Sequence, residues 1–337
     1  MNAGRKILVV GGGGYVGPVL TEHLLGAGYG VRNMDLFLYA TQEVLAPFDA
    51  NPRFEMVQAD HCDRARLAGA LDGVTDVVIL GGLVGDPITR KYPDAHRVIN
   101  HDGILGLIDT LDGRGLDRVV FVSTCSNYGL VDGDALAGED YPLKPLSLYA
   151  EAKVAVEQRL LALAGKVDYR PTILRFATAF GLAPRMRFDL TVNEFTREMY
   201  LGRELLVYDS HTWRPYCHLG DFCDVIGRVL EAAERDVAFQ VFNAGGDTGN
   251  FTKQMIVDAI LEFLPDAPIR YENKGQDTRN YRVDFAKIRT VLDFEPAYTV
   301  RDGISELIKA LDDQRFDDAD ARPNFYGNYE IDYPVAG

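Results

Sequence analysis

The chain has 337 residues, of which 47% are hydrophobic, enough apolar material for two domains or for one large domain that carries a smaller one. Fifty acidic residues outnumber thirty-five basic ones, and the formal net charge of −15 disfavours binding to nucleic acid or to an anionic membrane surface. No apolar run reaches the length of a membrane span, and we expect no signal peptide at the amino terminus.

The cysteines indicate a reducing compartment. Cys62, Cys125, Cys217 and Cys223 form no C-x-x-C pair and show no zinc-ligand spacing. We therefore expect free thiols, a cytoplasmic location and no metal site.

Short apolar runs alternate with amphipathic stretches in the first half of the chain. The runs cover residues 7–10, 31–34, 54–57, 77–80 and 119–122, and helices are predicted over 16–26, 102–111 and 147–163. This order favours an α/β protein with a Rossmann-type, doubly wound parallel sheet.

The second half has a looser pattern. It predicts strands at 172–175, 204–207 and 240–243, a loop at 183–187, and helices at 190–201, 221–233 and 252–264, the last capped by Thr252. We expect a Rossmann domain over 1–177, to which 219–247 returns, and a smaller α/β carboxyl-terminal domain over 178–218 and 248–312. Residues 313–337 are expected to form an acidic tail, and the Asp-rich stretch 312–320, at the boundary with that tail, is expected to be a solvated edge.

A run of glycines joins the first predicted strand to the first predicted helix. Gly11, Gly14 and Gly17 have the spacing of a turn that needs positive φ angles, on which a pyrophosphate can sit at the helix amino terminus. A bare turn without a ligand is the alternative. Asp35 ends the second strand, where a carboxylate accepts hydrogen bonds from the adenine ribose diol. Because that carboxylate repels a 2′-phosphate, the sequence predicts NAD rather than NADP as cofactor.

An acidic residue also ends the third predicted strand. Asp60 either bonds the adenine amine or caps the following helix, and the sequence leaves both interpretations open. His61 follows it and offers its backbone to the adenine, and we do not expect it to bind a metal.

Three side chains form a group that can handle a proton. Tyr149 and Lys153 lie four residues apart on one face of a predicted helix, and Thr124 ends the fifth strand, where ligands bind in parallel sheets. Removing a proton from a sugar hydroxyl needs a base with a pKa near neutrality, whereas free tyrosine has a pKa of about 10. We expect Lys153 and the charge of an oxidised nicotinamide to lower the pKa of Tyr149. We expect Thr124 to hold the same substrate oxygen. A surface pair is the alternative for a tyrosine and a lysine at this spacing.

These motifs, in this order and spacing, resemble the extended short-chain dehydrogenase/reductases, and most closely the sugar-nucleotide epimerase/dehydratase family that includes UDP-galactose 4-epimerase. The resemblance spans nearly the whole chain and weakens after about residue 312. It implies that one set of residues binds the cofactor: Gly11, Gly14, Tyr15, Val16, Gly17, Asp35, Leu36, Asp60, His61, Leu80, Gly81, Gly82, Asn100, Ser123, Tyr149, Lys153 and Phe176.

The resemblance also implies that the carboxyl-terminal part binds a nucleotide sugar. The candidate residues are Thr178, Arg185, Arg187, Asn193, Arg214 and Arg279. Guanidinium groups suit phosphates because they stay charged and bond in pairs, although a surface salt bridge is the alternative for each arginine. Relatives form homodimers through a four-helix bundle, to which 102–111 and 147–163 would contribute.

The residues after Thr124 reduce the number of candidate reactions. Related 4,6-dehydratases place Asp-Glu there, related decarboxylases place a glutamate at the second position, and related 3,5-epimerases place a cysteine at the second position. This chain has Cys125 and Ser126. Strand alternation turns Cys125 to the other side, so we interpret it as a packed apolar residue.

The chemistry that remains is 4-epimerisation of a nucleotide sugar, by oxidation at C4, rotation of the 4-keto intermediate and re-reduction. A 4-ketosugar reductase or dehydrogenase, a sugar-nucleotide dehydratase and a non-catalytic NAD-binding protein stay open as alternatives.

Overall fold

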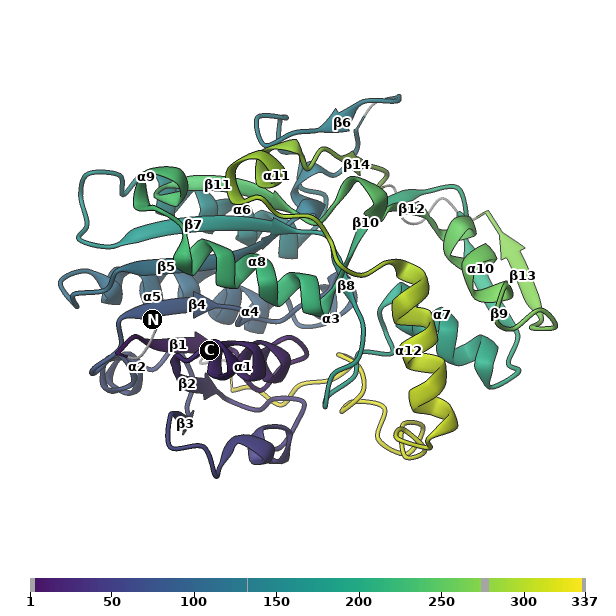
Figure 1. Ribbon diagram of the computed structural model, residues 1–337, viewed down its shortest axis with the longest axis horizontal. Coiled ribbons are helices and arrows are strands. Elements are labelled where there is room, and N and C mark those ends of the chain that lie inside the picture. The colour runs from purple at the N-terminus through teal and green to yellow at the C-terminus, as the bar shows by residue number, and fades with distance from the viewer. Residues whose placement is uncertain (1–3, 132, 274–278, 335–337) are drawn as a thin grey trace.

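A seven-stranded parallel sheet lies at the centre of the computed structural model, which describes residues 4–131, 133–273 and 279–334 (Figure 1). The strand order is β11-β7-β5-β4-β1-β2-β3. The strands are β1 (Lys6–Val10), β2 (Gly30–Asp35), β3 (Phe54–Gln58), β4 (Asp76–Ile79), β5 (Arg118–Thr124), β7 (Arg170–Phe176) and β11 (Gln240–Ala244). The predicted Rossmann-type fold is confirmed.

Helices cover both faces of this sheet because the side chains of each buried strand alternate between them. Ile7 and Val9 of β1 join an apolar cluster with α1 (Gly17–Gly26), α8 (Leu219–Glu231) and α11 (Ala286–Leu292). Leu8 and Val10 join a second cluster with α2 (Arg64–Ala70), α5 (Ile104–Leu111) and α6 (Leu148–Leu161). The carboxyl ends of the strands therefore meet at one edge, between two helical layers.

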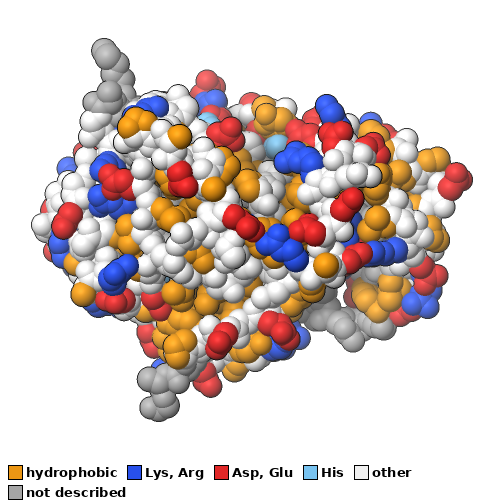
Figure 2. Space-filling view, turned by 90° about the horizontal axis from the view of Figure 1, so that it is seen from below, with side chains coloured by type: hydrophobic (Ala, Val, Ile, Leu, Met, Phe, Trp, Pro, Cys, Tyr) orange, Lys and Arg blue, Asp and Glu red, His pale blue; other side chains and the backbone are white. Residues whose placement is uncertain are grey.

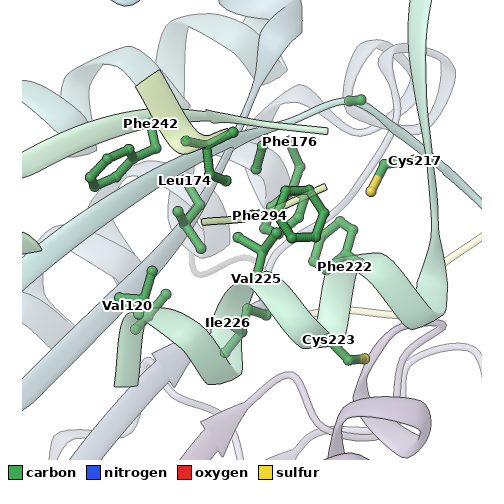
Figure 3. Close-up of a cluster of buried hydrophobic side chains, with 14 of the residues drawn as sticks. Val120, Leu174, Phe176, Cys217, Phe222, Cys223, Val225, Ile226, Phe242 and Phe294 are labelled. Carbon is green, nitrogen blue, oxygen red and sulfur yellow. The ribbon is translucent and has the colours of Figure 1, made fainter. Parts of the chain in front are cut away.

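The packing of α8 brings a late segment back to the sheet. Figure 3 shows Phe222, Val225 and Ile226 of α8 close to Val120 and Leu174 of the sheet. The ring of Phe222 also stacks on that of Phe176. Each large apolar side chain buried in this way contributes about 2 kcal/mol. The segment 219–247 thus lies with the sheet, and so does α11, although the sequence places residues 248–312 in the other unit.

A smaller unit follows the sheet and stands at the right of Figure 1. Its strands are β8 (Thr178–Phe180), β9 (Leu205–Tyr208), β10 (Trp213–His218), β12 (Asn250–Thr252) and β13 (Ile269–Glu272). Its helices are α7 (Thr191–Tyr200), α10 (Lys253–Leu261) and α12 (Val300–Asp312). They share one apolar cluster, and Thr252 caps α10 as predicted by accepting a hydrogen bond from Met255 N.

Short elements complete the chain. They are α3 (Asp86–Lys91), α4 (Pro93–His96), α9 (Glu234–Val237), the 3-10 helices η1 (Gln42–Phe48), η3 (Cys125–Tyr128) and η4 (Asp247–Gly249), the π-helix η2 (Arg97–Gly103), and the paired strands β6 (Leu136–Ala137) and β14 (Arg282–Val283). Within the described residues no helix is long and apolar enough to cross a membrane.

The carboxyl-terminal segment, residues 313–334, is only partly solvated. Within the predicted solvated edge, 312–320, Phe316 and Ala319 are buried, and so are Phe325 and Tyr326 beyond it; all four pack with side chains from the amino-terminal half. The aspartates between them face outward, so acidic composition and apolar burial coexist in one stretch. On the face shown in Figure 2, basic side chains lie singly or in small groups among acidic ones.

Candidate active site

One cavity of about 510 Å³ opens at the carboxyl edge of the sheet, between the sheet and the smaller unit. It is lined by most of the residues that the sequence predicts for cofactor, catalysis and substrate. Three predicted residues, Gly17, Asn100 and Asn193, do not line it.

The glycine turn brings the backbone of β1 against that of the loop after β4. Gly11 has a φ of +85°, and a Cβ at this position would lie 2.6 Å from the Cα of Gly81. Only glycine fits such an approach. Gly17 packs in the same way against the carbonyl of Gly12 and serves the turn rather than the cavity.

The amino terminus of α1 then faces the cavity without a side-chain cap, so its free N–H groups suit an anion.

Asp35 is held in place by the turn. Its carboxylate accepts hydrogen bonds from the backbone N–H groups of Gly13, at 2.8 Å, and Phe37, at 2.6 Å. Burial raises the pKa of Asp35, and these two bonds oppose that shift. Each carboxylate oxygen keeps a further lone pair for a ligand hydroxyl.

Asp60 does not cap the next helix, because Asp63 does so by accepting from Ala65 N and Arg66 N. Asp60 accepts instead from Cys62 N at 2.8 Å and from the hydroxyl of Tyr333 at 2.7 Å.

The neighbouring His61 makes a 3.0 Å hydrogen bond through Nε2 to the carbonyl of Ile99, and burial lowers its pKa. These bonds hold both residues at the end of the cavity that lies beyond β3.

Two residues predicted to bind ligands bond other groups of the protein instead. The amide of Asn100 bonds both backbone groups of Leu83, at 2.7 and 2.8 Å, and so fixes the loop after β4. The amide of Asn193 bonds the Tyr15 hydroxyl at 2.9 Å and the Arg187 carbonyl at 3.1 Å. Both side chains are buried and are satisfied by these partners.

The three residues that the sequence predicts as a proton-handling group all line the cavity near the end of β5. Thr124 ends that strand, and Tyr149 and Lys153 line the cavity from α6, whose amino terminus Ser147 caps. The Thr124 Oγ1 accepts a hydrogen bond from Ser126 N at 3.1 Å, which leaves its proton available for another partner.

The electrostatics of Tyr149 differ from the sequence-based expectation. Burial raises its pKa, the nearby Asp86 carboxylate raises it further, and Arg187 opposes the shift. Lys153 is itself buried, which lowers its pKa to about 8, and its Nζ donates to the Val122 carbonyl at 2.7 Å. The lysine is thus directed at the strand end, and desolvation of the phenol outweighs the charges around it.

The side chains of Ser123 and Cys125 bond buried groups of the protein. The Ser123 hydroxyl donates to Glu157, which also pairs with Arg175 at 2.7 Å. Cys125 is 1% exposed, its thiol lies 3.0 Å from the Arg175 carbonyl, and burial raises its pKa. The interpretation of Cys125 as a packed residue agrees with this geometry.

The four arginines predicted to bind the substrate all line the cavity, and their partners differ. Arg187 pairs with Asp189 at 2.5 Å, and Arg279 pairs with Asp86 at 2.5 Å. The guanidinium of Arg214 lies 5.0 Å from the centre of the Tyr281 ring.

Arg185 is 2% exposed, and its Nε has no hydrogen-bond partner among the described residues. Burial and the adjacent Arg187 lower the pKa of Arg185 to about 10, while its Nη2 donates to the Gly327 carbonyl and to Asn328.

The sequence misses several residues that line the cavity: Asp86, Ser126, Asp189, Tyr216, Lys253, Tyr281, Asn328, Tyr329 and Tyr333. The hydroxyls of Ser126 and Tyr281 lie 3.2 Å apart beside Thr124. Tyr281 and Tyr333 bond Ser126 and Asp60 across long stretches of the chain, and local motifs do not mark such contacts.

The parallel sheet, the glycine turn and the Tyr149–Lys153 helix define an extended short-chain dehydrogenase/reductase. Residues 7–245 match the model of the NAD dependent epimerase/dehydratase family, and the chain belongs to that family. Its cofactor is NAD, which fits the glycine turn, the carboxylate of Asp35 and the Arg185 Nε, an atom without a hydrogen-bond partner in the described part of the chain.

Relatives with different activities match the chain equally well. A dTDP-glucose 4,6-dehydratase of Streptomyces niveus is 27% identical over 330 residues, covering 92% of this chain and 94% of that protein. A UDP-glucose 4-epimerase of Mycolicibacterium smegmatis is 26% identical over 311 residues, covering 90% and 97%. The crystal structure of the dTDP-glucose 4,6-dehydratase DesIV of Streptomyces venezuelae with bound NAD is 26% identical, covers 92% of this chain and 98% of that one, and has a TM-score of 0.83.

Proposed function

We propose that the protein is an NAD-dependent 4-epimerase of a nucleotide-activated sugar. The observation that carries this proposal is the pair of residues after Thr124: Cys125 is packed inside the protein, and Ser126 bonds Tyr281. Neither side chain can supply the carboxylic acid with which a dehydratase removes water. When bound, NAD supplies the hydride acceptor and donor.

In this proposal, side chains of the protein transfer the proton and stabilise the charge that develops on the substrate. The Tyr149 phenolate accepts the proton of the sugar C4 hydroxyl and later returns it. Thr124 donates its free proton to the same oxygen and stabilises the charge that develops there. Lys153 lowers the barrier by its positive charge once it moves from the Val122 carbonyl toward the ligand.

The two ends of the cavity serve different parts of the ligands. We assign Asp35 to the adenine ribose, Asp60 and His61 to the adenine, and the turn from Gly11 to Val16 to the NAD pyrophosphate. Arg214 and Arg279, with Thr178 and Arg187, bind the diphosphate and sugar of the substrate. Arg185 supplies a cation between these two sets. The buried Arg185 guanidinium, shielded from water, favours a phosphate partner.

The rival function is 4,6-dehydration, which the identity to Streptomyces niveus dTDP-glucose 4,6-dehydratase favours. A panel of UDP-, GDP-, ADP-, CDP- and dTDP-sugars separates the two, with products read by mass spectrometry and proton NMR. We expect unchanged mass and an inverted coupling at C4. Loss of water or of carbon dioxide would contradict epimerisation, and net consumption of added NADH would indicate a ketosugar reductase.

We also propose that the protein is a cytoplasmic homodimer that pairs through α5 and α6. Leu148 and Leu161 of α6 are 42% and 37% exposed, and their pairing with a second copy would cover them. Light scattering after size-exclusion chromatography measures the oligomeric state, and a monomer at micromolar concentration would contradict this assignment.

A further inference from the structure

The carboxyl-terminal segment, residues 313–334, leaves α12 in the smaller unit and runs back to the Rossmann unit, as the yellow trace in Figure 1 shows. Charged contacts fix it at both ends. Asp320 pairs with Arg197 at 2.7 Å in the smaller unit. Near the other end, the Lys91 ammonium bonds the Tyr329 carbonyl at 3.2 Å and Glu330 at 3.1 Å. The segment therefore spans the mouth between the two units.

The middle of the segment is tied to both sides of the cavity. Asn328 is 6% exposed, and its side chain donates to the Val84 carbonyl at 3.0 Å, in the loop after β4. The same side chain accepts from Arg185 at 2.8 Å, and Arg185 also donates to the Gly327 carbonyl at 3.0 Å. Asn328 thus holds the one predicted ligand arginine whose Nε has no partner among the described residues.

The end of the segment closes the cavity beside Asp60. The Tyr333 hydroxyl donates to Asp60 Oδ2 at 2.7 Å, while Cys62 N occupies Oδ1. The pKa of Asp60 is lowered; burial alone would raise it, and the bonds from Cys62 and Tyr333 outweigh that effect. Ile331 and Tyr333 pack against a buried cluster that includes Leu83 and Ile88. Tyr333 therefore lies at the cavity wall with its hydroxyl on a cofactor-site carboxylate.

We propose that residues 328–333 form the outer wall of the NAD site, that Tyr333 is an adenosine-binding residue, and that this wall retains NAD between turnovers. Tyr333 orients the Asp60 carboxylate toward the adenine amine and covers that end of the cavity. Asn328 positions the Arg185 guanidinium. The inference rests on the orientation of NAD proposed above.

Retention suits the proposed reaction. An epimerase regenerates its NAD in every turnover and needs no exchange, whereas a reductase or dehydrogenase must release its cofactor each time. A segment that crosses the mouth and bonds both sides has to detach before NAD leaves, which adds a barrier to release. The opposite arrangement, in which Tyr333 takes the place of the adenine, would make its removal strengthen NAD binding.

The test compares three variants with the full chain. The first ends at Gly327 and keeps the buried Phe325 and Tyr326. The second, Tyr333→Phe, removes only the hydroxyl that bonds Asp60. The control, Tyr326→Phe, removes a hydroxyl of the same segment that bonds Asp318 and does not line the cavity.

Each protein is loaded with NAD, freed of excess cofactor and diluted, and the NAD that remains bound is followed with time by chromatography. Thermal unfolding checks that each variant is folded. We expect the chain ending at Gly327 to release NAD at least about tenfold faster, Tyr333→Phe about three- to tenfold faster, and Tyr326→Phe at the rate of the full chain.

Unchanged or slower release from both the truncated chain and Tyr333→Phe would overturn the proposal, and if the truncated chain does not fold, Tyr333→Phe decides alone. The readout needs no sugar, so failure of this inference and failure of 4-epimerisation are measured separately. If the full chain epimerises sugars but the two variants release NAD at its rate, only the proposal that residues 328–333 retain NAD is contradicted. If truncation speeds the release of NAD but the full chain does not epimerise any sugar tested, only the proposed 4-epimerisation is contradicted.

Discussion

The Nζ of Lys153 lies 5.7 Å from the centre of the Tyr149 ring, one turn away on α6, and donates to the Val122 carbonyl. The ammonium is therefore near the phenol but is bonded to the strand that carries Thr124. Burial is the largest influence on both groups, raising the pKa of Tyr149 and lowering that of Lys153. In the proposed function, the positive charge of the oxidised nicotinamide would lower the pKa of Tyr149.

Tyr149→Phe should lower the epimerisation rate by about 10²- to 10⁴-fold, because the proposed function assigns to this phenol the exchange of the proton of the C4 hydroxyl. Its NAD content should stay that of the unmodified protein, which absorbance and chromatography measure. Tyr169→Phe is the matched control, since Tyr169 is buried under the sheet and its hydroxyl has no partner among the described residues. A Tyr149→Phe protein that keeps its full rate would remove Tyr149 from the role of base.

Lys153→Met should stabilise the cofactor-free protein at pH 7 by on the order of 2 kcal/mol, because the buried ammonium has a folded-state pKa of about 8 against 10.5 when unfolded. Between these values the unfolded chain binds more protons. The unfolding free energy of the unmodified protein therefore rises with pH across this window, and the advantage of the variant should shrink from pH 8 to pH 10. Urea unfolding at several pH values measures it, and a constant difference would contradict the burial of a charged lysine.

Asp35→Asn should shift cofactor preference toward NADP, because it removes the charge that repels a 2′-phosphate. Its single amide oxygen can accept from either Gly13 N or Phe37 N, and the other hydrogen bond is lost. We expect NAD to bind about tenfold more weakly and NADP more tightly than in the unmodified protein. Titration calorimetry with both cofactors measures the ratio. Equal losses for NAD and NADP would mean that Asp35 only supports the turn.

Glu157→Gln should destabilise the protein by about 3 kcal/mol, because it leaves the Arg175 guanidinium buried without its counter-charge. Glu157 and Arg175 are 1% and 4% exposed, so water cannot replace the lost partner. Urea unfolding is the measurement, and Glu151→Gln, at an exposed position of the same helix, is the control. The double variant Glu157→Gln/Arg175→Met should recover part of the loss, and a Glu157→Gln protein as stable as the control would contradict this prediction.

The amino-acid sequence determined what depends on neighbours along the chain. The turn around Gly11 joins a buried strand to a helix, Asp35 ends the next strand, and Tyr149 and Lys153 share a helix face by periodicity. These features are local, so spacing alone indicates the fold, the cofactor and the proton-handling group.

Only the tertiary structure decided where distant residues meet. Tyr281 reaches Ser126 across 155 positions, and Tyr333 reaches Asp60 across 273. Asn100 and Asn193 have the residue types of ligand-binding positions, but packing turns their amides inward. The pKa of Tyr149 likewise depends on how much water the fold removes, which spacing does not encode. The cavity that Thr124, Tyr149 and Lys153 line is therefore completed by side chains from distant parts of the chain, which only the fold brings together.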